Sequence, residues 1–149
     1  MSEILPRLFL GGINHTYDRE FLHAENITHI LSIVELTHTT DAMSEKGVIH
    51  MSICMYDSDA EPIYDVLERA VAFIHDAVNS NGAVYVHCVM GMSRSPTLVA
   101  AYLMAHHAMN AEEAIKFLVE RRPIVCPNDG FRAALKRWES PSSAAAAKT

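Results

Sequence analysis

The sequence has few cysteines, and none of them forms a paired motif. Its three cysteines, Cys54, Cys88 and Cys126, are widely separated in a chain of 149 residues, and there is no C-x-x-C pair. A zinc ribbon, a redox dithiol and a disulfide framework are therefore not expected, and the three thiols should be reduced. The nine histidines include no H-x-x-x-H pair, so we expect no metal and no cofactor.

Long apolar runs and an excess of positive charge are also missing. No stretch approaches the roughly 20 apolar residues that span a bilayer, and the start of the chain lacks the basic and apolar regions of a signal peptide. The formal net charge of −6 argues against nonspecific binding to nucleic acid. We therefore expect no membrane and no nucleic-acid partner, and a location in the cytoplasm or the nucleus.

What the sequence does contain is enough hydrophobic material for one folded domain, because 50% of its residues are hydrophobic. Stretches with strand character are residues 8–12, 27–36, 48–55 and 83–88. Stretches with helical spacing are residues 17–24, 61–78, 95–108, 111–121 and 129–138. This alternation predicts an α/β domain over residues 1–140, with a central, mostly parallel sheet of about four to five strands flanked by helices. The low-complexity tail, residues 141–149, is predicted to be disordered.

The stretch "VHCVMGMSRSP", residues 86–96, joins a predicted strand to a predicted helix. A strand–loop–helix element directs several backbone N–H groups and the positive end of a helix at one point, which suits an anion such as phosphate. Cys88 in that field is favoured as a thiolate nucleophile, and the planar fork of Arg94 can hold two phosphate oxygens. Gly91 permits the turn. A lone cysteine after a strand is more often a small buried hydrophobe, but this one is accompanied by the glycine and the arginine.

The segment "HCVMGMSRS" resembles the signature of the cysteine-dependent protein phosphatases, and the small atypical dual-specificity branch is the nearest match. Flanking blocks, including "ITHILSI" and "RRPIVCPNDGF", extend the resemblance to about residue 138 and imply a protein tyrosine phosphatase-like fold. The resemblance makes Cys88 the nucleophile, His87 a support for its thiolate, and Ser95 a hydrogen-bond donor to its sulfur. The backbone that would cradle the phosphate is that of Val89, Met90, Gly91, Met92, Ser93 and Arg94.

The resemblance also implies a general acid on a separate loop, and "MYDSDAEP" offers two candidates. Spacing to the block "ERAVAFI" selects Asp57 over Asp59. Either carboxylate could instead be a solvated loop residue or a helix cap. Asn128 matches a family position that braces the phosphate loop, although an asparagine there also suits a turn.

The implied activity is hydrolysis of phosphotyrosine and of phosphoserine or phosphothreonine in phosphorylated proteins. One alternative is a phosphatase of phosphoinositides or other non-protein substrates. Apolar Val89, Met90 and Met92 disfavour it, because extra phosphates need extra cations. The other alternative is a noncatalytic phosphopeptide-binding module. A further hypothesis is a Cys54–Cys88 disulfide, which requires the strands that lead to these cysteines to adjoin.

Overall fold

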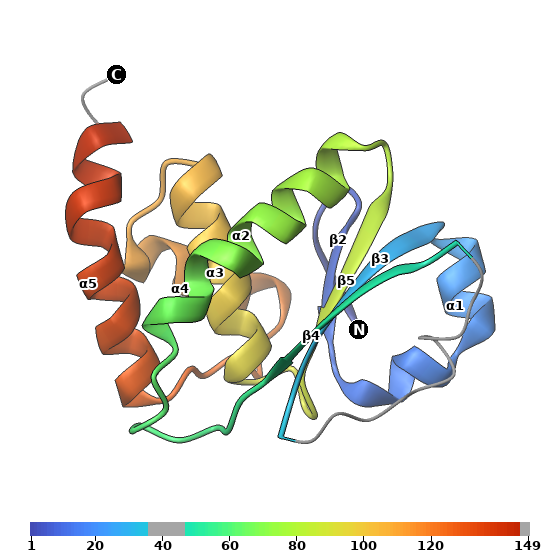
Figure 1. The fold of residues 1–149 in the computed structure, drawn as a ribbon, viewed down its shortest axis with the longest axis horizontal. Helices are drawn as coiled ribbons and strands as arrows, with labels where there is room; N and C mark the ends of the chain where they lie inside the picture. The colour runs from blue at the N-terminus through green and yellow to red at the C-terminus, as the bar shows by residue number, and fades with distance from the viewer. Residues whose placement is uncertain (36–46, 147–149) are drawn as a thin grey trace.

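A five-stranded sheet forms the centre of the protein (Figure 1). The computed structural model describes residues 1–35 and 47–146, with side chains to residue 139. The strands are β1 (Ser2–Leu5), β2 (Leu8–Gly11), β3 (Ile27–Val34), β4 (Ile49–Cys54) and β5 (Ala83–His87). Their order is β1-β2-β5-β3-β4, and only β1 and β2 pair antiparallel. The predicted α/β fold with a mostly parallel sheet is confirmed, and β1 is a strand that the sequence analysis did not predict.

Helices cover both faces of this sheet (Figure 1). One face carries α2 (Tyr64–Asn79), α3 (Arg94–His106), α4 (Ala111–Arg121) and α5 (Asp129–Ala146). The other face carries the short 3-10 helix η1 (Ile13–Tyr17) and α1 (Arg19–Ala24). Within the described ranges, no helix is long and apolar enough to cross a membrane.

Some predicted boundaries differ from those in the structure. The predicted helix 17–24 is divided, because Asp18 stands between η1 and α1 and accepts a hydrogen bond from the Phe21 N–H at 3.0 Å. Helix α5 continues to Ala146, past the predicted end at residue 138 and into the segment for which the sequence predicts disorder. Strand β3 ends at Val34, and residue 36 of the predicted strand lies outside the described residues.

Strand β5 is buried along its whole length, as its continuous apolar sequence predicts. Val84 and Val86 pack in the core formed with the four long helices, whereas Tyr85 packs on the opposite face with Phe21 of α1. This two-sided burial fixes the strand that leads directly to Cys88.

Three parallel neighbours, β5, β3 and β4, end at the same edge of the sheet. The chain continues from β3 into Glu35, from β4 into Met55 and Asp57, and from β5 into Cys88. In open α/β sheets, ligands bind at the carboxyl ends of the strands. The predicted site residues therefore come together at this edge.

Candidate active site

The phosphate loop, residues 88–94, turns four consecutive carbonyl groups away from its centre. These are the carbonyls of Val89, Met90, Gly91 and Met92. The Val89 oxygen accepts a hydrogen bond from the Ile13 N–H at 3.0 Å, and the Met92 oxygen accepts one from the Cys126 N–H at 2.7 Å. The Met90 and Gly91 oxygens both accept hydrogen bonds from the side chain of Arg122. In a trans peptide the N–H points opposite to the carbonyl, and none of the described peptide bonds is cis. The N–H groups of these four peptides consequently face the inside of the loop.

Arg122 anchors the outside of this loop, and the sequence analysis gave it no role. Its Nε donates to the Gly91 oxygen and its Nη2 to the Met90 oxygen, both at 2.9 Å. Its Nη1 also donates to the Ser2 hydroxyl at 3.2 Å, which ties the loop to β1. The signal was its position in the block "RRPIVCPNDGF", which contributed to the family resemblance.

Gly91 occupies a position that no other residue can take without strain. Its φ is +68°, in the left-handed region. A Cβ on Gly91 would lie 2.6 Å from both the carbonyl carbon and the oxygen of Gly11, at the end of β2. The sequence analysis expected a turn here, and this close approach gives the further reason for a glycine.

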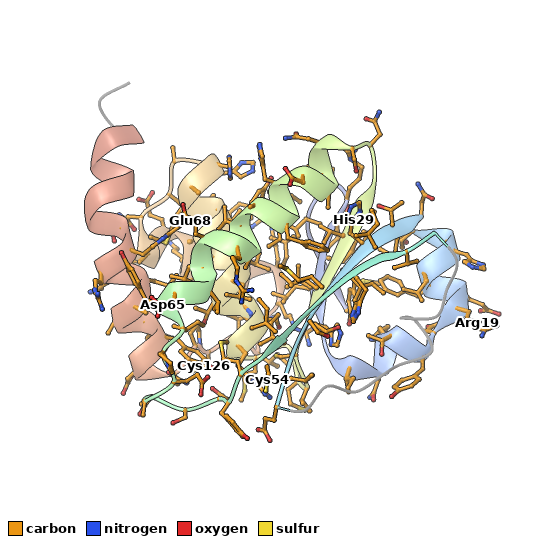
Figure 2. The ribbon with its side chains drawn as sticks, in the orientation of Figure 1. Arg19, His29, Cys54, Asp65, Glu68 and Cys126 are labelled. Carbon is orange, nitrogen blue, oxygen red and sulfur yellow. The ribbon has the colours of Figure 1, made fainter. Side chains whose placement is uncertain are left out.

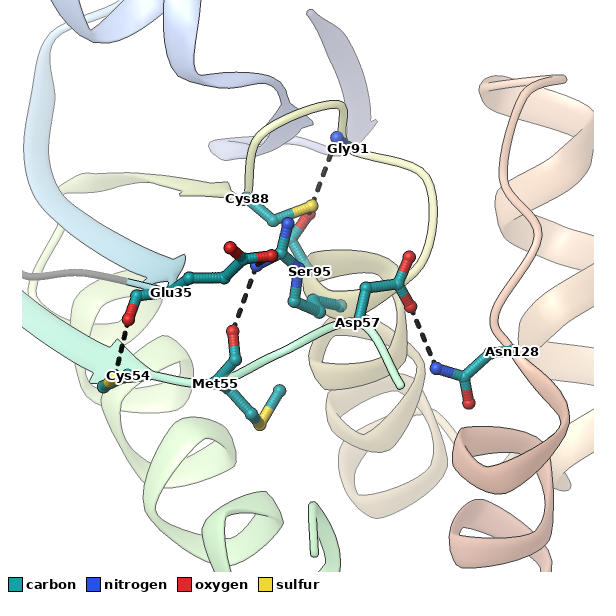
Figure 3. Close-up of polar contacts among 9 residues, drawn as sticks. Glu35, Cys54, Met55, Asp57, Cys88, Gly91, Ser95 and Asn128 are labelled. Carbon is teal, nitrogen blue, oxygen red and sulfur yellow. Dashed lines mark hydrogen bonds and ion pairs between the residues drawn. The ribbon is translucent and has the colours of Figure 1, made fainter. Parts of the chain in front are cut away.

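Cys88 lies at the base of the loop with 2% of its surface exposed. Its Sγ accepts hydrogen bonds from the Gly91 N–H at 3.2 Å and from the Ser95 hydroxyl at 3.0 Å (Figure 3). Donors directed at a sulfur stabilise negative charge on it. Ser95 therefore makes the contact that the resemblance implied.

Helix α3 begins at Arg94, the last residue of the loop, and directs the positive end of its dipole toward it. The Ser93 hydroxyl at the N-cap position accepts a hydrogen bond from the Asn128 N–H at 3.0 Å instead of capping the helix. The first turn of α3 contains no acidic side chain. Neither a side-chain cap nor an acidic side chain therefore competes with an anion bound in the loop for the N-terminus of α3.

Arg94 contacts the ends of both β3 and β4, through Glu35 and Met55. Its side chain is buried, and its Nη1 donates to the Met55 carbonyl at 3.0 Å. The same nitrogen lies 3.8 Å from a carboxylate oxygen of Glu35, a contact that the sequence analysis did not anticipate. These contacts fix the plane of a guanidinium that has further N–H donors to offer an anion.

Asn128 connects the predicted acid loop, the phosphate loop and α5. Its Nδ2 donates to Asp57 Oδ1 at 2.9 Å (Figure 3), and its Oδ1 accepts from the Phe131 N–H at 2.9 Å in the first turn of α5. Asp59, the alternative candidate, accepts from the Gly130 N–H at 3.3 Å instead. Asp57 therefore shares a partner with the phosphate loop, whereas Asp59 binds farther along α5.

Comparison with known proteins agrees with this geometry. Residues 8–141 match the family model for the catalytic domain of dual specificity phosphatases. The chain belongs to the dual specificity phosphatase family. Members of this family hydrolyse phosphate esters through a phosphocysteine intermediate, so the predicted family, enzyme class and fold are confirmed.

Individual relatives of this dual specificity phosphatase cover nearly all of its chain. It is 35% identical over 140 residues to dual specificity protein phosphatase 22-B of Danio rerio, covering 94% of this chain and 74% of that one. The crystal structure of human DUSP28 superimposes with a TM-score of 0.88 at 28% identity over 100% of both chains. A structure of PTPMT1 in complex with PI(5)P gives a TM-score of 0.83 at 27% identity, covering 97% of each chain.

His87 lies behind the phosphate loop of this phosphatase in a chain of hydrogen bonds. The pKa of His87 is lowered to about 4, chiefly by burial; the hydrogen bond to the Cys88 carbonyl raises it in part, and the nearby His50 makes a smaller contribution that lowers it. A carbonyl can only accept, so Nδ1 carries the proton and donates to the Cys88 oxygen at 3.1 Å. The bare Nε2 then accepts from the Ser32 hydroxyl at 2.6 Å, and His50 Nε2–H donates to that hydroxyl at 2.8 Å. A neutral His87 in one tautomer thus fixes the end of β5.

The hypothesis of a Cys54–Cys88 disulfide fails because the strands leading to these cysteines do not adjoin. Strand β3 lies between β4 and β5, which places β4 and β5 roughly 10 Å apart. A disulfide needs Cα atoms within about 7 Å. Cys54 is exposed and its thiol donates to the Glu35 carbonyl at 3.0 Å, and Cys126 is exposed as well (Figure 2).

Proposed function

We propose that this phosphatase removes phosphate from phosphotyrosine, phosphoserine and phosphothreonine in proteins, with Cys88 as the nucleophile. The observation that carries the proposal is the loop around its sulfur: four carbonyls point outward, and a backbone N–H and a hydroxyl point at Sγ. A phosphate in this loop would receive the inward-facing N–H groups of residues 90–93. The Arg94 guanidinium would hold two of its oxygens and stabilise the charge that they carry during transfer.

In the first step, the Cys88 thiolate attacks phosphorus in line with the leaving oxygen. A sulfur–phosphorus bond forms as the phosphorus–oxygen bond to the substrate side chain breaks. Asp57 gives a proton to the departing oxygen. Asn128 Nδ2 donates to Asp57 Oδ1, so Oδ1 is the accepting, carbonyl-like oxygen of the protonated acid. The proton that is transferred would therefore be carried by Oδ2, the oxygen to which Asn128 does not donate.

In the second step, water attacks the phosphocysteine, and the Asp57 carboxylate, now deprotonated, takes a proton from this water. The sulfur–phosphorus bond breaks, and inorganic phosphate and the Cys88 thiolate are released. The Ser95 hydroxyl, 3.0 Å from Sγ, donates a hydrogen bond to the sulfur as it leaves. Over the two steps, one phosphate ester and one water molecule are consumed, and one alcohol or phenol and one inorganic phosphate are formed.

Protein substrates are favoured over phosphoinositides by the side chains of the loop. The similarity to PTPMT1, solved with PI(5)P, keeps an inositol lipid as the second candidate substrate class. Val89, Met90 and Met92 are, however, exposed apolar side chains beside the cradle. They offer no cation to the additional phosphates of an inositol headgroup. They offer instead apolar surface to the residues that flank a phosphorylated side chain.

We infer phosphorylated proteins as the partners, with neither nucleic acid nor membrane, because the net charge is −6. The cytoplasm or the nucleus is the inferred location, since three free cysteines suit a reducing compartment.

Hydrolysis assays with two variants test the proposed function. Cys88→Ser should abolish turnover of phosphotyrosine and phosphoserine peptides. Asp57→Ala should slow turnover of both peptides by about 10²-fold or more, because their leaving oxygens are basic, and should affect an aryl phosphate with a very acidic phenol far less. Phosphoinositide vesicles assayed in parallel should be poor substrates. Activity retained in Cys88→Ser, or faster release from the lipid than from the peptides, would contradict the proposal.

A further inference from the structure

We propose that Asp59 and Gly130 are positioning residues that dock the acid loop, residues 56–61, onto the first turn of α5. This inference rests on the proposed function of Asp57 as the general acid. Asp57 is exposed and lies on a loop between β4 and α2, so its carboxyl group needs contacts that hold it over the phosphate loop. A general acid acts only when it is within hydrogen-bond reach of the leaving oxygen.

Two parallel contacts join the acid loop to α5. Asp57 Oδ1 accepts from Asn128 Nδ2 at 2.9 Å, and two residues later Asp59 Oδ1 accepts from the Gly130 N–H at 3.3 Å. The first N–H groups of a helix lack partners within the helix. Asp59 satisfies the one at Gly130, and its negative charge is favourable at this end of the helix dipole. The contact of Asp59 with Gly130 therefore supports the orientation that the contact with Asn128 gives to the Asp57 carboxyl group.

Gly130 is required for the two segments to approach this closely. A Cβ at this position would overlap the backbone oxygen of Asp59 and lie 2.7 Å from both its Cα and its carbonyl carbon. These are backbone atoms, so the whole loop would have to move to make room. Glycine is otherwise unfavourable inside a helix, where alanine is preferred. The close approach of the acid loop explains why a glycine stands in the first turn of α5.

Displacement of the loop would act on proton transfer and leave anion binding unaffected. In the proposed mechanism, a phosphate is bound by the N–H groups of residues 90–93 and by Arg94, and neither contact of the acid loop with the start of α5 involves these groups. Moving a reacting group by about 1 Å can cost about 10²-fold in rate. The defect should therefore depend on how much the leaving group needs a proton.

The experiment compares kcat for a phosphotyrosine peptide and for an aryl phosphate with a very acidic phenol. Gly130→Ala should lower kcat for the peptide by about 10- to 100-fold, and much less for the acidic phenol. Asp59→Ala should give a smaller loss of the same kind. Asp59→Asn keeps an accepting oxygen for the Gly130 N–H and should restore most of the activity. Inhibition by vanadate should be unchanged in all three variants.

Two controls separate docking from other effects. Asp129→Ala removes a neighbouring exposed carboxylate of the same helix turn and should leave kcat near the wild-type value. In an Asp57→Ala background, Gly130→Ala should have little further effect, because the group that it positions is already gone. Gly130→Ala should still unfold in one cooperative thermal transition, because the change displaces an exposed loop and alanine itself favours the helix.

Several results would overturn the inference. If Asp57→Ala shows the leaving-group-dependent defect but Gly130→Ala and Asp59→Ala do not, the docking proposal is wrong and the proposed function stands. Equal losses in Asp59→Asn and Asp59→Ala would mean that the charge or proton of Asp59, and not its accepting oxygen, is what matters. If Asp57→Ala lacks the defect, the acid is misassigned and both proposals fail at this residue.

Discussion

Lowering the pH from about 7.5 to about 5 should destabilise the fold by about 2 kcal/mol through His87 alone. Burial lowers the pKa of this imidazole to about 4, whereas an unfolded chain restores the ordinary value of 6.5. Between these two values the unfolded state binds a proton that the native state does not. Stability is therefore fully present above pH 6.5 and is lost at about 1.4 kcal/mol per unit as the pH falls toward 4.

Urea denaturation at the two pH values measures this loss, with His87→Gln as the matched variant. Glutamine does not titrate, so the variant should lose about 2 kcal/mol less than the wild type over the same range. Burial also lowers the pKa of other histidines, including His50 and His29, but these remain in the variant. The difference between the two slopes therefore isolates His87. Parallel slopes would refute a buried, neutral His87 and the hydrogen-bond chain built on it.

Three further predictions concern the phosphate loop. Arg122→Ala removes two charged donors from loop carbonyls and should weaken vanadate inhibition by about 10-fold or more, whereas Arg121→Ala, at the neighbouring last residue of α4, should not; equal effects would exclude the anchoring role. Gly91→Ala should abolish vanadate binding in a protein that still folds by circular dichroism, because a side chain there meets Gly11; wild-type inhibition would contradict this. Iodoacetate should alkylate Cys88 rapidly near neutral pH, and vanadate should block the reaction. A rate no faster than that of the exposed Cys126 would argue against a stabilised thiolate.

The phosphate loop was predictable because everything that defines it is contiguous in the sequence. Cys88, Gly91 and Arg94 lie within seven residues, between an apolar strand and a helix. Covalent connection and the short-range geometry of a strand–loop–helix element therefore bring them together whatever the remainder of the fold does. The same reasoning predicted the mostly parallel sheet, since hydrophobic periodicity is also a local property.

The groups that hold this loop and its acid in place come from distant parts of the chain, and only the tertiary structure decided them. Arg122 reaches Gly91 across 31 residues, and Asn128 reaches Asp57 across 71. In the sequence, only the spacing to the block "ERAVAFI" favoured Asp57 over Asp59. In the structure their partners differ, because Asn128, just before α5, presents a side-chain amide to Asp57, and Gly130 presents a backbone N–H to Asp59. The strand order, too, is a property of the assembled sheet, and placing β3 between β4 and β5 separated the two cysteines that a disulfide would have joined. Sequence alone determined the chemistry of the loop, because neighbouring residues carry it; packing determined its support, because contacts between distant residues exist only once the chain has folded.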